Sequence, residues 1–318
     1  MTLSIIVACV DAGRSITECL RRLEIARTAV DAEVIVVDAS SDDTIPRVEA
    51  FGGDVQVIQM APGTLTPRLW AEGYRRAKGR VIAFTTGHCL VTPWWAAALV
   101  EAIDAGAAGA GGPLVLAPEA RTLDVAVYYL RYSGCIPAIF GSGRVTGEIA
   151  GDNAAYDRRW LERFNDSLAD GFWEFDFHRL VRAEGGWLVA VPAAQVEFGR
   201  SFPAATIVRH RFAHAVLFGA ERVHQRSRSA LQMVLASPFV PAVLLGRAAH
   251  RVFRSRSPVR RFLAAVPWFT VLAATWAAGE AKGAVRASAV QAQRSARDGT
   301  TLVPEHSDPS HLSNGAQV

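Results

Sequence analysis

The stretch LSIIVACVDAGRSITECLRRLEIARTAVDAEVIVVD, residues 3–38, decides the fold of this chain. Its apolar runs at 3–10 and 33–38 are continuous, which is typical of strands that are buried on both faces of a sheet. Between them, residues 15–29 carry apolar side chains at helical spacing. A strand, a helix and a second buried strand in this order predict two parallel strands joined by a right-handed crossover.

The same alternation continues along the next part of the chain. The sequence predicts a helix over 43–51, a strand over 55–58, a helix over 66–77 and a strand over 80–85. Such alternation indicates an α/β fold with a mostly parallel sheet. Ligands of these sheets bind at the carboxyl ends of the strands. The polar residues that follow the strands are therefore expected around one crevice: Asp11, Asp38–Asp43 and Thr86–His88.

Less regular elements follow this alternation. The sequence predicts a helix over 93–105, a strand over 113–117, a helix ending near 185 and a strand over 189–198. From about residue 203 the pattern is helical, and after 287 it becomes polar. A helical segment and a disordered tail are therefore expected behind the α/β part.

The composition excludes several classes of protein. The 318 residues are 50% hydrophobic, with a mean hydropathy of +0.17 and a formal net charge of +4. These values exclude a disordered chain, a collagen-like chain and a disulfide scaffold. The four cysteines form no Cys-x-x-Cys pair, and the N-terminal apolar run is too short for a signal peptide. A reducing cytosol is the expected compartment, and the positive mean hydropathy makes membrane contact a further hypothesis.

Charge and hydropathy separate the C-terminal part from the rest. Residues 1–200 hold 19 basic and 25 acidic side chains, whereas 201–318 hold 15 basic and 5 acidic ones. The apolar stretches 230–246 and 262–279 are at the short limit for a membrane span, and six arginines lie between them. Two spans would place these arginines outside the cell, against the positive-inside tendency.

We therefore expect a helical hairpin that lies in the cytosolic leaflet, with its arginines against anionic lipid. A soluble helical lid or a dimer interface is the alternative. Nucleic acid is not an expected partner, because no aromatic and basic platform accompanies the arginines. His210 and His214 are four residues apart on a predicted helix, which fits an interfacial basic helix better than a metal pair.

Five segments occur in a fixed order: SIIVACVDAGRSITECLRRL, EVIVVDASSDDT, GYRRAKGRVIAFT, GDNAAYDRR and WEFDFHRLVRAEG. Together they resemble the inverting glycosyltransferases of family 2, over roughly residues 3–200. The resemblance implies a GT-A, Rossmann-like fold, in which a mostly parallel sheet has flanking helices and a nucleotide-sugar site at its strand ends. The expected domains are a GT-A nucleotide-sugar-binding and catalytic domain (1–203), a helical membrane-associating segment (204–286) and a disordered tail (287–318).

The resemblance also implies the residues that bind the donor. Asp11 matches a residue that lies against the nucleotide, and Asp38 matches an aspartate that accepts a hydrogen bond from the base. Gly151, Asp152 and Asn153 match a segment that contacts the donor sugar and diphosphate. A turn or helix-capping role is the alternative for Asp38, and an Asx turn is the alternative for residues 151–153.

One position departs from the family pattern. Thr86 and His88 stand where relatives of this family have an Asp-x-Asp pair that holds a divalent cation, and a hydroxyl and an imidazole are poor ligands for a hard cation. Phe198 stands at the expected position of a further metal-binding histidine. The resemblance thus implies Mg²⁺ or Mn²⁺, while the residues present make no cofactor certain.

Three explanations of this departure stay open. His88 and an arginine could stabilise the diphosphate without metal, a metal could bind through Glu197 or other groups, or catalysis could be lost.

The candidate catalytic base is an acidic residue near the start of a helix. Matching Arg182–Gly185 to the family's R-x-x-G puts Glu174 on the catalytic-base aspartate and Asp176 on the second acidic position. Residues two apart on a helix point roughly 200° apart, so only one of them can face a site. We expect Glu174 to act as the base and Asp176 to be structural. The alternative is that Glu174 only stabilises the helix N-terminus.

The predicted function is transfer of a sugar, with inversion, from a nucleotide-sugar donor to a hydroxyl acceptor. A lipid-linked or polysaccharide acceptor of a cell-envelope glycoconjugate is expected, at the cytoplasmic face of the cell membrane. The first alternative is a catalytically inactive nucleotide-sugar-binding or scaffolding homologue at the membrane. The second is a nucleotidyltransferase, of whose glycine-rich first loop residues 12–14 are a weak version.

Overall fold

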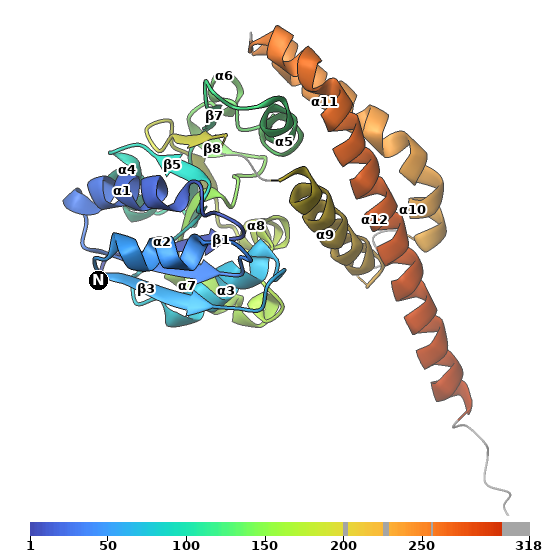
Figure 1. Ribbon diagram of the computed structural model, residues 1–318. Coiled ribbons are helices and arrows are strands. Elements are labelled where there is room, and N and C mark those ends of the chain that lie inside the picture. Colours follow the sequence, from blue (N-terminus) through green and yellow to red (C-terminus); the bar gives the residue numbers. More distant parts are fainter. Residues whose placement is uncertain (200–202, 225–228, 256, 301–318) are drawn as a thin grey trace, which may run out of the picture.

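The computed structural model describes residues 1–199, 203–224, 229–255 and 257–300. A mixed α/β part and a set of long helices make up this portion of the chain (Figure 1). The predicted fold class is confirmed: a large, mostly parallel sheet is followed by a helical C-terminal segment.

The parallel half of the sheet is built from the strands that the apolar runs predict. In spatial order these are β3 (Val55–Gln59), β2 (Ala32–Asp38), β1 (Leu3–Cys9) and β4 (Val81–Thr86). All residues of β1 are buried, as expected of a central strand with sheet neighbours and helices around it. Cys9 pairs with Asp38 and Ala8 pairs with Thr86, so the ends of β2 and β4 flank the end of β1.

The rest of the sheet mixes directions. Beyond β4 it continues through β9 (Asn153–Asp157), β6 (Gly109–Gly111), β10 (Leu188–Ala190) and β8 (Gly143–Val145). A second sheet consists of β5 (Cys89–Val91), β11 (Val196–Phe198) and β7 (Leu114–Leu116). The single strand predicted over 189–198 is therefore wrong. It is two short strands in different sheets, separated by a turn at Pro192, which cannot donate to a ladder.

Short helices flank the sheet. They are α1 (Ile16–Ala26), α2 (Thr44–Phe51), α3 (Thr66–Arg76), α4 (Trp95–Asp104), α5 (Thr122–Tyr132), α6 (Pro137–Phe140), α7 (Arg158–Arg163) and α8 (Glu174–Ala183), with 3-10 turns at Arg27–Ala29 and Asn165–Leu168. Helix α3 packs on β1 and β2, whereas α1 packs on β5. Gly73 permits the contact between α3 and β1, because a Cβ at residue 73 would lie 2.3 Å from Ile6 Cγ2.

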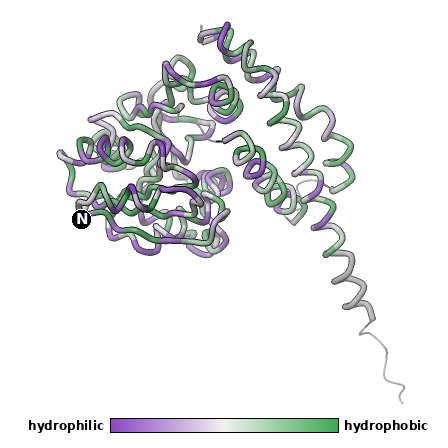
Figure 2. The backbone as a smooth tube through the Cα atoms, in the orientation of Figure 1, coloured by the Kyte–Doolittle hydropathy of each residue, from purple (hydrophilic) through white to green (hydrophobic). Residues whose placement is uncertain are grey.

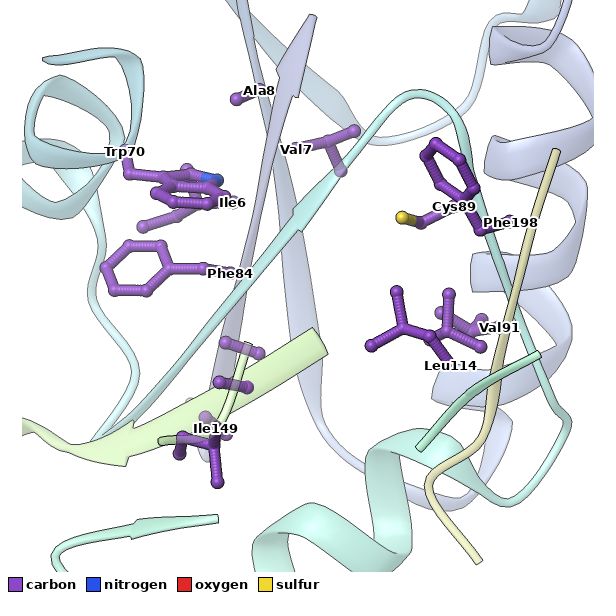
Figure 3. Packing of buried hydrophobic residues seen from close by; sticks show 14 of the residues in the cluster. Ile6, Val7, Ala8, Trp70, Phe84, Cys89, Val91, Leu114, Ile149 and Phe198 are labelled. Carbon is purple, nitrogen blue, oxygen red and sulfur yellow. The ribbon is translucent and has the colours of Figure 1, made fainter. Parts of the chain in front are cut away.

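The core lies on both sides of β1. Figure 3 shows Ile6 pointing toward Trp70 and Phe84, whereas Val7 points toward the side of Phe198, as the alternation of a strand requires. The rings of Trp70 and Phe84 are 5.6 Å apart, and Trp70 Nε1 donates to Thr85 O at 2.9 Å. This core fixes the position of Trp70 at the end of β4.

The described residues of the C-terminal segment form four helices and one 3-10 turn. They are α9 (Ala204–His224), α10 (Ala230–Ala236), the turn Ser237–Phe239, α11 (Val240–Arg254) and α12 (Val259–Thr300). Helix α12 packs along α9 and also against α5 (Figure 1). Glycines allow α9 and α12 to approach closely. A Cβ at Gly219 would lie 2.1 Å from Glu280 O, and one at Gly283 would lie 1.9 Å from Val216 O.

Helix α12 continues to Thr300, beyond residue 287, where the sequence predicts the start of a disordered tail. Alanine, glutamine and arginine, which favour helices, are frequent in this polar stretch. The remainder of the predicted tail, 301–318, lies outside the described residues.

Two of the six arginines expected at lipid instead bind protein. Arg251 donates to Ser133 Oγ at 3.1 Å, and Arg261 donates to the carbonyl of Ala120 at 2.9 Å. Arg256 lies outside the described residues. The remaining three are exposed: Arg247, Arg254 and Arg260.

Two helical regions, Ala230–Arg254 and Val259–Val290, are long and apolar enough to cross a membrane by length and composition alone. Figure 2 shows hydrophobic stretches along them. Only 6% of the first is buried against protein, compared with 39% of the second. The first therefore presents far more of its apolar surface than a core helix would.

Candidate active site

A cavity of about 140 Å³ lies at the carboxyl ends of β1 and β4. The α/β part contributes Val10, Trp70, Thr86, His88, Arg131, Asp152, Glu174 and Phe198, among others. Helices α9 and α12 close the other side with Thr206, His210, Arg211, His214, Leu272 and Trp276. The C-terminal helices are therefore part of the wall of this cavity.

Asp152 is the best-anchored carboxylate of the cavity. It is buried, and it accepts hydrogen bonds from Arg131 Nη2 at 2.7 Å and from the Tyr132 hydroxyl at 2.8 Å. Both donors come from the end of α5. A backbone turn, in which Asn153 N donates to Ala150 O, places Asp152 at the head of β9. This backbone turn is not the Asx turn expected as an alternative, since the printed partners of the Asp152 side chain are Arg131 and Tyr132, and the side chain lines the cavity.

Glu174 begins α8 and lines the same cavity. Burial, followed by repulsion from Asp152, raises its pKa to about 7, although Arg131 opposes this shift. Gly151 makes room beside it, because a Cβ at residue 151 would lie 2.9 Å from the ring of Trp70 and 3.4 Å from Glu174 Oε2. A carboxyl with a pKa near neutrality is suited to proton transfer.

Asp176 does not line this cavity. It lines a second one, of about 650 Å³, together with Trp173, Arg179 and Leu217, and its nearest oxygen is 4.0 Å from Arg179 Nη2. Glu174 and Asp176 therefore face different spaces, as their spacing on a helix requires.

Thr86 and His88 are at the cavity, but both are occupied within the protein. Thr86 Oγ1 donates to Cys89 Sγ at 3.3 Å. His88 Nε2 is 3.1 Å from Val10 O and its Nδ1 is 3.3 Å from Ser15 Oγ. Burial lowers the pKa of His88 to about 4, so the ring is neutral at pH 7. A protonated His88 is therefore not the group that would stabilise a diphosphate.

The donor set does not fit a divalent cation. Among the described residues, no three His, Cys, Asp or Glu side chains are grouped as a metal site. Glu197 is on β11 and does not line the cavity, where Phe198 stands instead. Since Mg²⁺ and Mn²⁺ prefer several oxygen ligands, the neutral pair Thr86 and His88 gives neither ion a site.

Asp11 and Asp38 lie beside the cavity rather than in its wall. Both Asp38 oxygens accept from Ser40, through its backbone N–H and its hydroxyl, and burial raises the pKa of Asp38. Asp11 has φ 51° and accepts from Ser41 N at 2.9 Å. The alternative of a turn role for Asp38 matches these bonds, and the two loops brace each other at the ends of β1 and β2.

Asn153 is separated from the cavity. Its amide nitrogen donates to the carbonyls of Pro113 and Ala194, and its oxygen accepts from Trp95 Nε1 at 2.7 Å. The side chain is completely buried. Because all these bonds are internal, Asn153 is a structural residue, and the expectation of a donor contact does not hold for it.

Arg211 is a cavity residue that the sequence did not single out. Its Nε donates to Leu272 O at 3.2 Å, and its guanidinium lies 4.7 Å from the ring centre of Trp276. It has no carboxylate partner among the residues that the structure describes. Burial, then repulsion from Arg131, lowers its pKa to about 9, so the group is still a cation at pH 7.

His210 and His214, which lie on α9 with Arg211, add no positive charge beside its guanidinium. Burial lowers the pKa of His214 to about 3 and lowers that of His210 as well. The ring of His214 packs against Trp173 and Trp276. Of the groups around Arg211, the sequence indicated only the basic helix, through the pattern HRFAH at residues 210–214.

Helix α8 is held in place by a buried network that also gave no signal in the sequence. The Tyr156 hydroxyl is 2.8 Å from His178 Nε2, and His178 Nδ1 bonds the carboxylate of Glu148. Arg182 also donates to Glu148, at 3.0 Å. The network links β9 to α8 and so fixes the helix that begins with Glu174.

The chain was compared with known proteins. The family described as "Glycosyl transferase family 2" matches residues 4–164. No curated protein matches. Among solved structures, a mannosyltransferase from Pyrobaculum calidifontis in complex with GDP-Man and Mn²⁺ is 21% identical, with a TM-score of 0.47, and the match covers 93% of this chain and 79% of that one.

Two further structures are similar at a comparable level. Glucosyl-3-phosphoglycerate synthase from Mycobacterium tuberculosis, in complex with Mn²⁺, UDP and phosphoglyceric acid, is 16% identical with a TM-score of 0.45, over 67% of this chain and 76% of that one. S. aureus TarS in complex with UDP is 15% identical with a TM-score of 0.47, and the match covers 88% of this chain and 92% of that one. The ligands named here belong to those proteins.

Proposed function

The chain belongs to glycosyl transferase family 2, and we propose that it transfers a sugar, with inversion, from a nucleotide-sugar donor to an acceptor hydroxyl. The observation that carries this proposal is the cavity that joins Glu174, Asp152 and Arg131 at the ends of β1 and β4. A carboxyl with a raised pKa beside a carboxylate that is anchored by hydrogen bonds is the pattern expected of a base next to a binding group.

Glu174 is the proposed general base. Its carboxylate removes the proton of the acceptor hydroxyl as that oxygen bonds to the anomeric carbon. The bond from this carbon to the donor diphosphate breaks on the opposite side, so the configuration inverts and a nucleoside diphosphate leaves. The pKa of about 7 gives Glu174 more basicity than an ordinary glutamate while leaving it largely ionised at pH 8.

Asp152 is proposed to orient the donor sugar. Arg131 and Tyr132 fix its carboxylate, which keeps lone pairs for sugar hydroxyls. The absence of a side chain at Gly151 lets the donor approach the backbone there. Asp11 and Asp38 are proposed to lie against the nucleoside, because their loops border the cavity at the ends of the neighbouring strands.

The acceptor is proposed to be membrane-linked or a polysaccharide, and the protein is proposed to work at the cytoplasmic face of the membrane. Three side chains of α10 and the following turn, Leu231, Leu235 and Phe239, are 64–69% exposed. Arg247 and Arg254 are exposed on the adjoining helix. Apolar side chains next to cations favour an anionic leaflet.

Measurements of turnover and of donor binding distinguish the proposed enzyme from the alternative, a catalytically inactive homologue that binds nucleotide sugars. Purified full-length protein is incubated with UDP-, GDP- and dTDP-sugars and a membrane extract, with EDTA or Mn²⁺, and nucleoside diphosphate release is measured. E174Q is expected to keep donor binding and to lose turnover by about 100-fold or more, the usual contribution of a general base. The matched control, E184Q, changes an exposed carboxylate at the other end of α8 and is expected to keep turnover.

Two results would contradict the proposal. Turnover by E174Q at the wild-type rate would remove Glu174 as the base. Donor binding by the wild type without turnover on any extract would favour the inactive nucleotide-sugar-binding homologue.

A further inference from the structure

Arg211 is a partly buried cation for which the described residues provide no carboxylate partner. Arg131, the other cation, is paired with Asp152 at 2.7 Å. Glu174 bears a full negative charge only well above pH 7. Keeping a guanidinium buried without a carboxylate costs free energy, and such a cost is typical of a site that awaits an anion.

The sheet side of the cavity offers no positive charge. Thr86 is neutral, and His88 is neutral with both ring nitrogens bonded within the protein. A departing diphosphate nevertheless requires positive charge close to its oxygens. Arg211 lines the same cavity as Thr86 and His88, and it is the cation of the cavity wall that has no carboxylate partner among the described residues.

The guanidinium of Arg211 is oriented as well as buried. The ring of Trp276 supports its plane, and Leu272 O binds its Nε. These two contacts leave both Nη groups for a ligand, since the described residues provide them with no hydrogen-bond acceptor. A planar fork of this kind matches two phosphate oxygens at once.

From these observations we propose that Arg211 binds the diphosphate of the donor, and of the departing nucleotide, in place of a divalent cation. The inference rests on the proposed glycosyl transfer and adds the residue that stabilises its leaving group. It assigns a binding residue to α9, outside the segment that matches the family.

The test measures binding of UDP, GDP and dTDP to full-length protein in EDTA by calorimetry, and continues with the tightest of them. Arg211→Gln is expected to weaken the binding of that nucleoside diphosphate at least tenfold. The bare nucleoside is expected to bind this variant as tightly as it binds the wild type. Arg211→Lys, which keeps the charge but loses the fork, is expected to recover only part of the affinity. Arg209→Gln, an exposed arginine of the same helix, is the matched control and is expected to leave the affinity unchanged.

A stability measurement excludes simple unfolding. Removing a partly buried charge that has no carboxylate partner relieves a desolvation cost, so Arg211→Gln is expected to unfold at the wild-type temperature or above it. Lost affinity with retained stability supports a ligand role for Arg211. An affinity within twofold of the wild type in Arg211→Gln would overturn the proposal.

Other arms of the same experiment separate this inference from the proposed function. If Arg211→Gln weakens the binding of inorganic pyrophosphate and of the nucleotide by the same factor, the result supports a contact between Arg211 and the diphosphate. If a short-chain polyprenyl phosphate loses affinity and the nucleotide does not, Arg211 serves the acceptor and the proposal fails, while glycosyl transfer stands. If the wild type binds none of the three nucleotides, both the inference and the proposed function fail.

Discussion

Glu174 combines two properties that follow from one location. It is partly buried, and desolvation raises its pKa to about 7; it also lines the cavity together with Asp152. The sequence placed it correctly near the start of a helix, because Arg182–Gly185 gave the register. Its pKa depends on Asp152 and Arg131, which are far away in the chain, so only the structure provides it.

The first prediction at this scale concerns pH. Glu174 acts as a base only when ionised, so turnover at saturating donor is expected to rise about tenfold per unit below its pKa of about 7 and to level off above it. A pH profile of turnover from 5.5 to 9 measures this. A profile that is flat between pH 6 and 8 would contradict the assignment of the base.

The second prediction concerns stability. The folded pKa of Glu174 is raised from 4.5 to about 7, so ionisation costs the folded state about 3 kcal/mol above pH 7 and almost nothing below pH 4.5. E174Q is therefore expected to be more stable than the wild type at pH 8 and equal to it near pH 4.5. Urea unfolding at both values tests this. E184Q, at an exposed site, should show no such difference, and an equal effect in both variants would refute the cause.

Sequence patterns predicted residues near strand ends better than residues that meet across the fold. Thr86 was expected at the cavity because it follows a strand whose apolar run is plain, whereas Asp152 was expected there only from the resemblance to the family. Arg131 was missed because residues 120–150 have no clear period, although α5 brings it to the cavity. Arg211 was missed because its partners, Leu272 and Trp276, are about sixty residues away on another helix.

At the scale of elements, the contact between α9 and α12 is made by glycines. Gly219 and Gly283 remove the side chains that would separate the two backbones. Two helices that approach so closely hold Arg211 and Trp276 in a fixed relation, because one residue is on each helix. The hydropathy pattern predicted both helices, but not that they would pack on one another.

A prediction follows for these glycines. Gly283→Ala places a Cβ 1.9 Å from Val216 O, and overpacking of this kind is expected to cost about 1–3 kcal/mol. Gly246→Ala, on α11, meets nothing within 4 Å and is expected to gain about 1 kcal/mol from helix propensity. Unfolding by guanidinium distinguishes the two. Equal stability of both variants would show that α9 and α12 are not packed so closely.

At the scale of the whole molecule, one side of the helical segment is apolar and poorly covered. Arg251 and Arg261 donate hydrogen bonds to the α/β part, so fewer guanidinium groups are available for lipid alone than the sequence predicts, although Arg251 is still exposed. Apolar contact should therefore contribute more to membrane binding than the charge pattern implies. The docking could not be read from the sequence, because an arginine bonded to backbone carbonyls and one at lipid look alike there.

The last prediction is for vesicles. Leu235→Glu combined with Phe239→Glu is expected to reduce flotation with phosphatidylglycerol vesicles at least tenfold, because charged groups replace exposed apolar ones. Arg247→Gln combined with Arg254→Gln is expected to reduce it about fivefold, and only at low salt. Ile25→Glu, at an exposed position of α1, is the control. Unchanged flotation of the first variant would refute the membrane proposal.

The shared wall of the cavity has a practical consequence for anyone who wishes to isolate the catalytic part. A fragment cut at residue 203, where the composition changes, would keep Glu174 and Asp152 and would have lost Arg211 and Trp276. Water would then fill the space beside Glu174, and its pKa would return toward 4.5, the value of an exposed glutamate. Such a fragment would also lack the part of the core that Phe262 and Phe269 contribute, and would give a false negative in an activity screen.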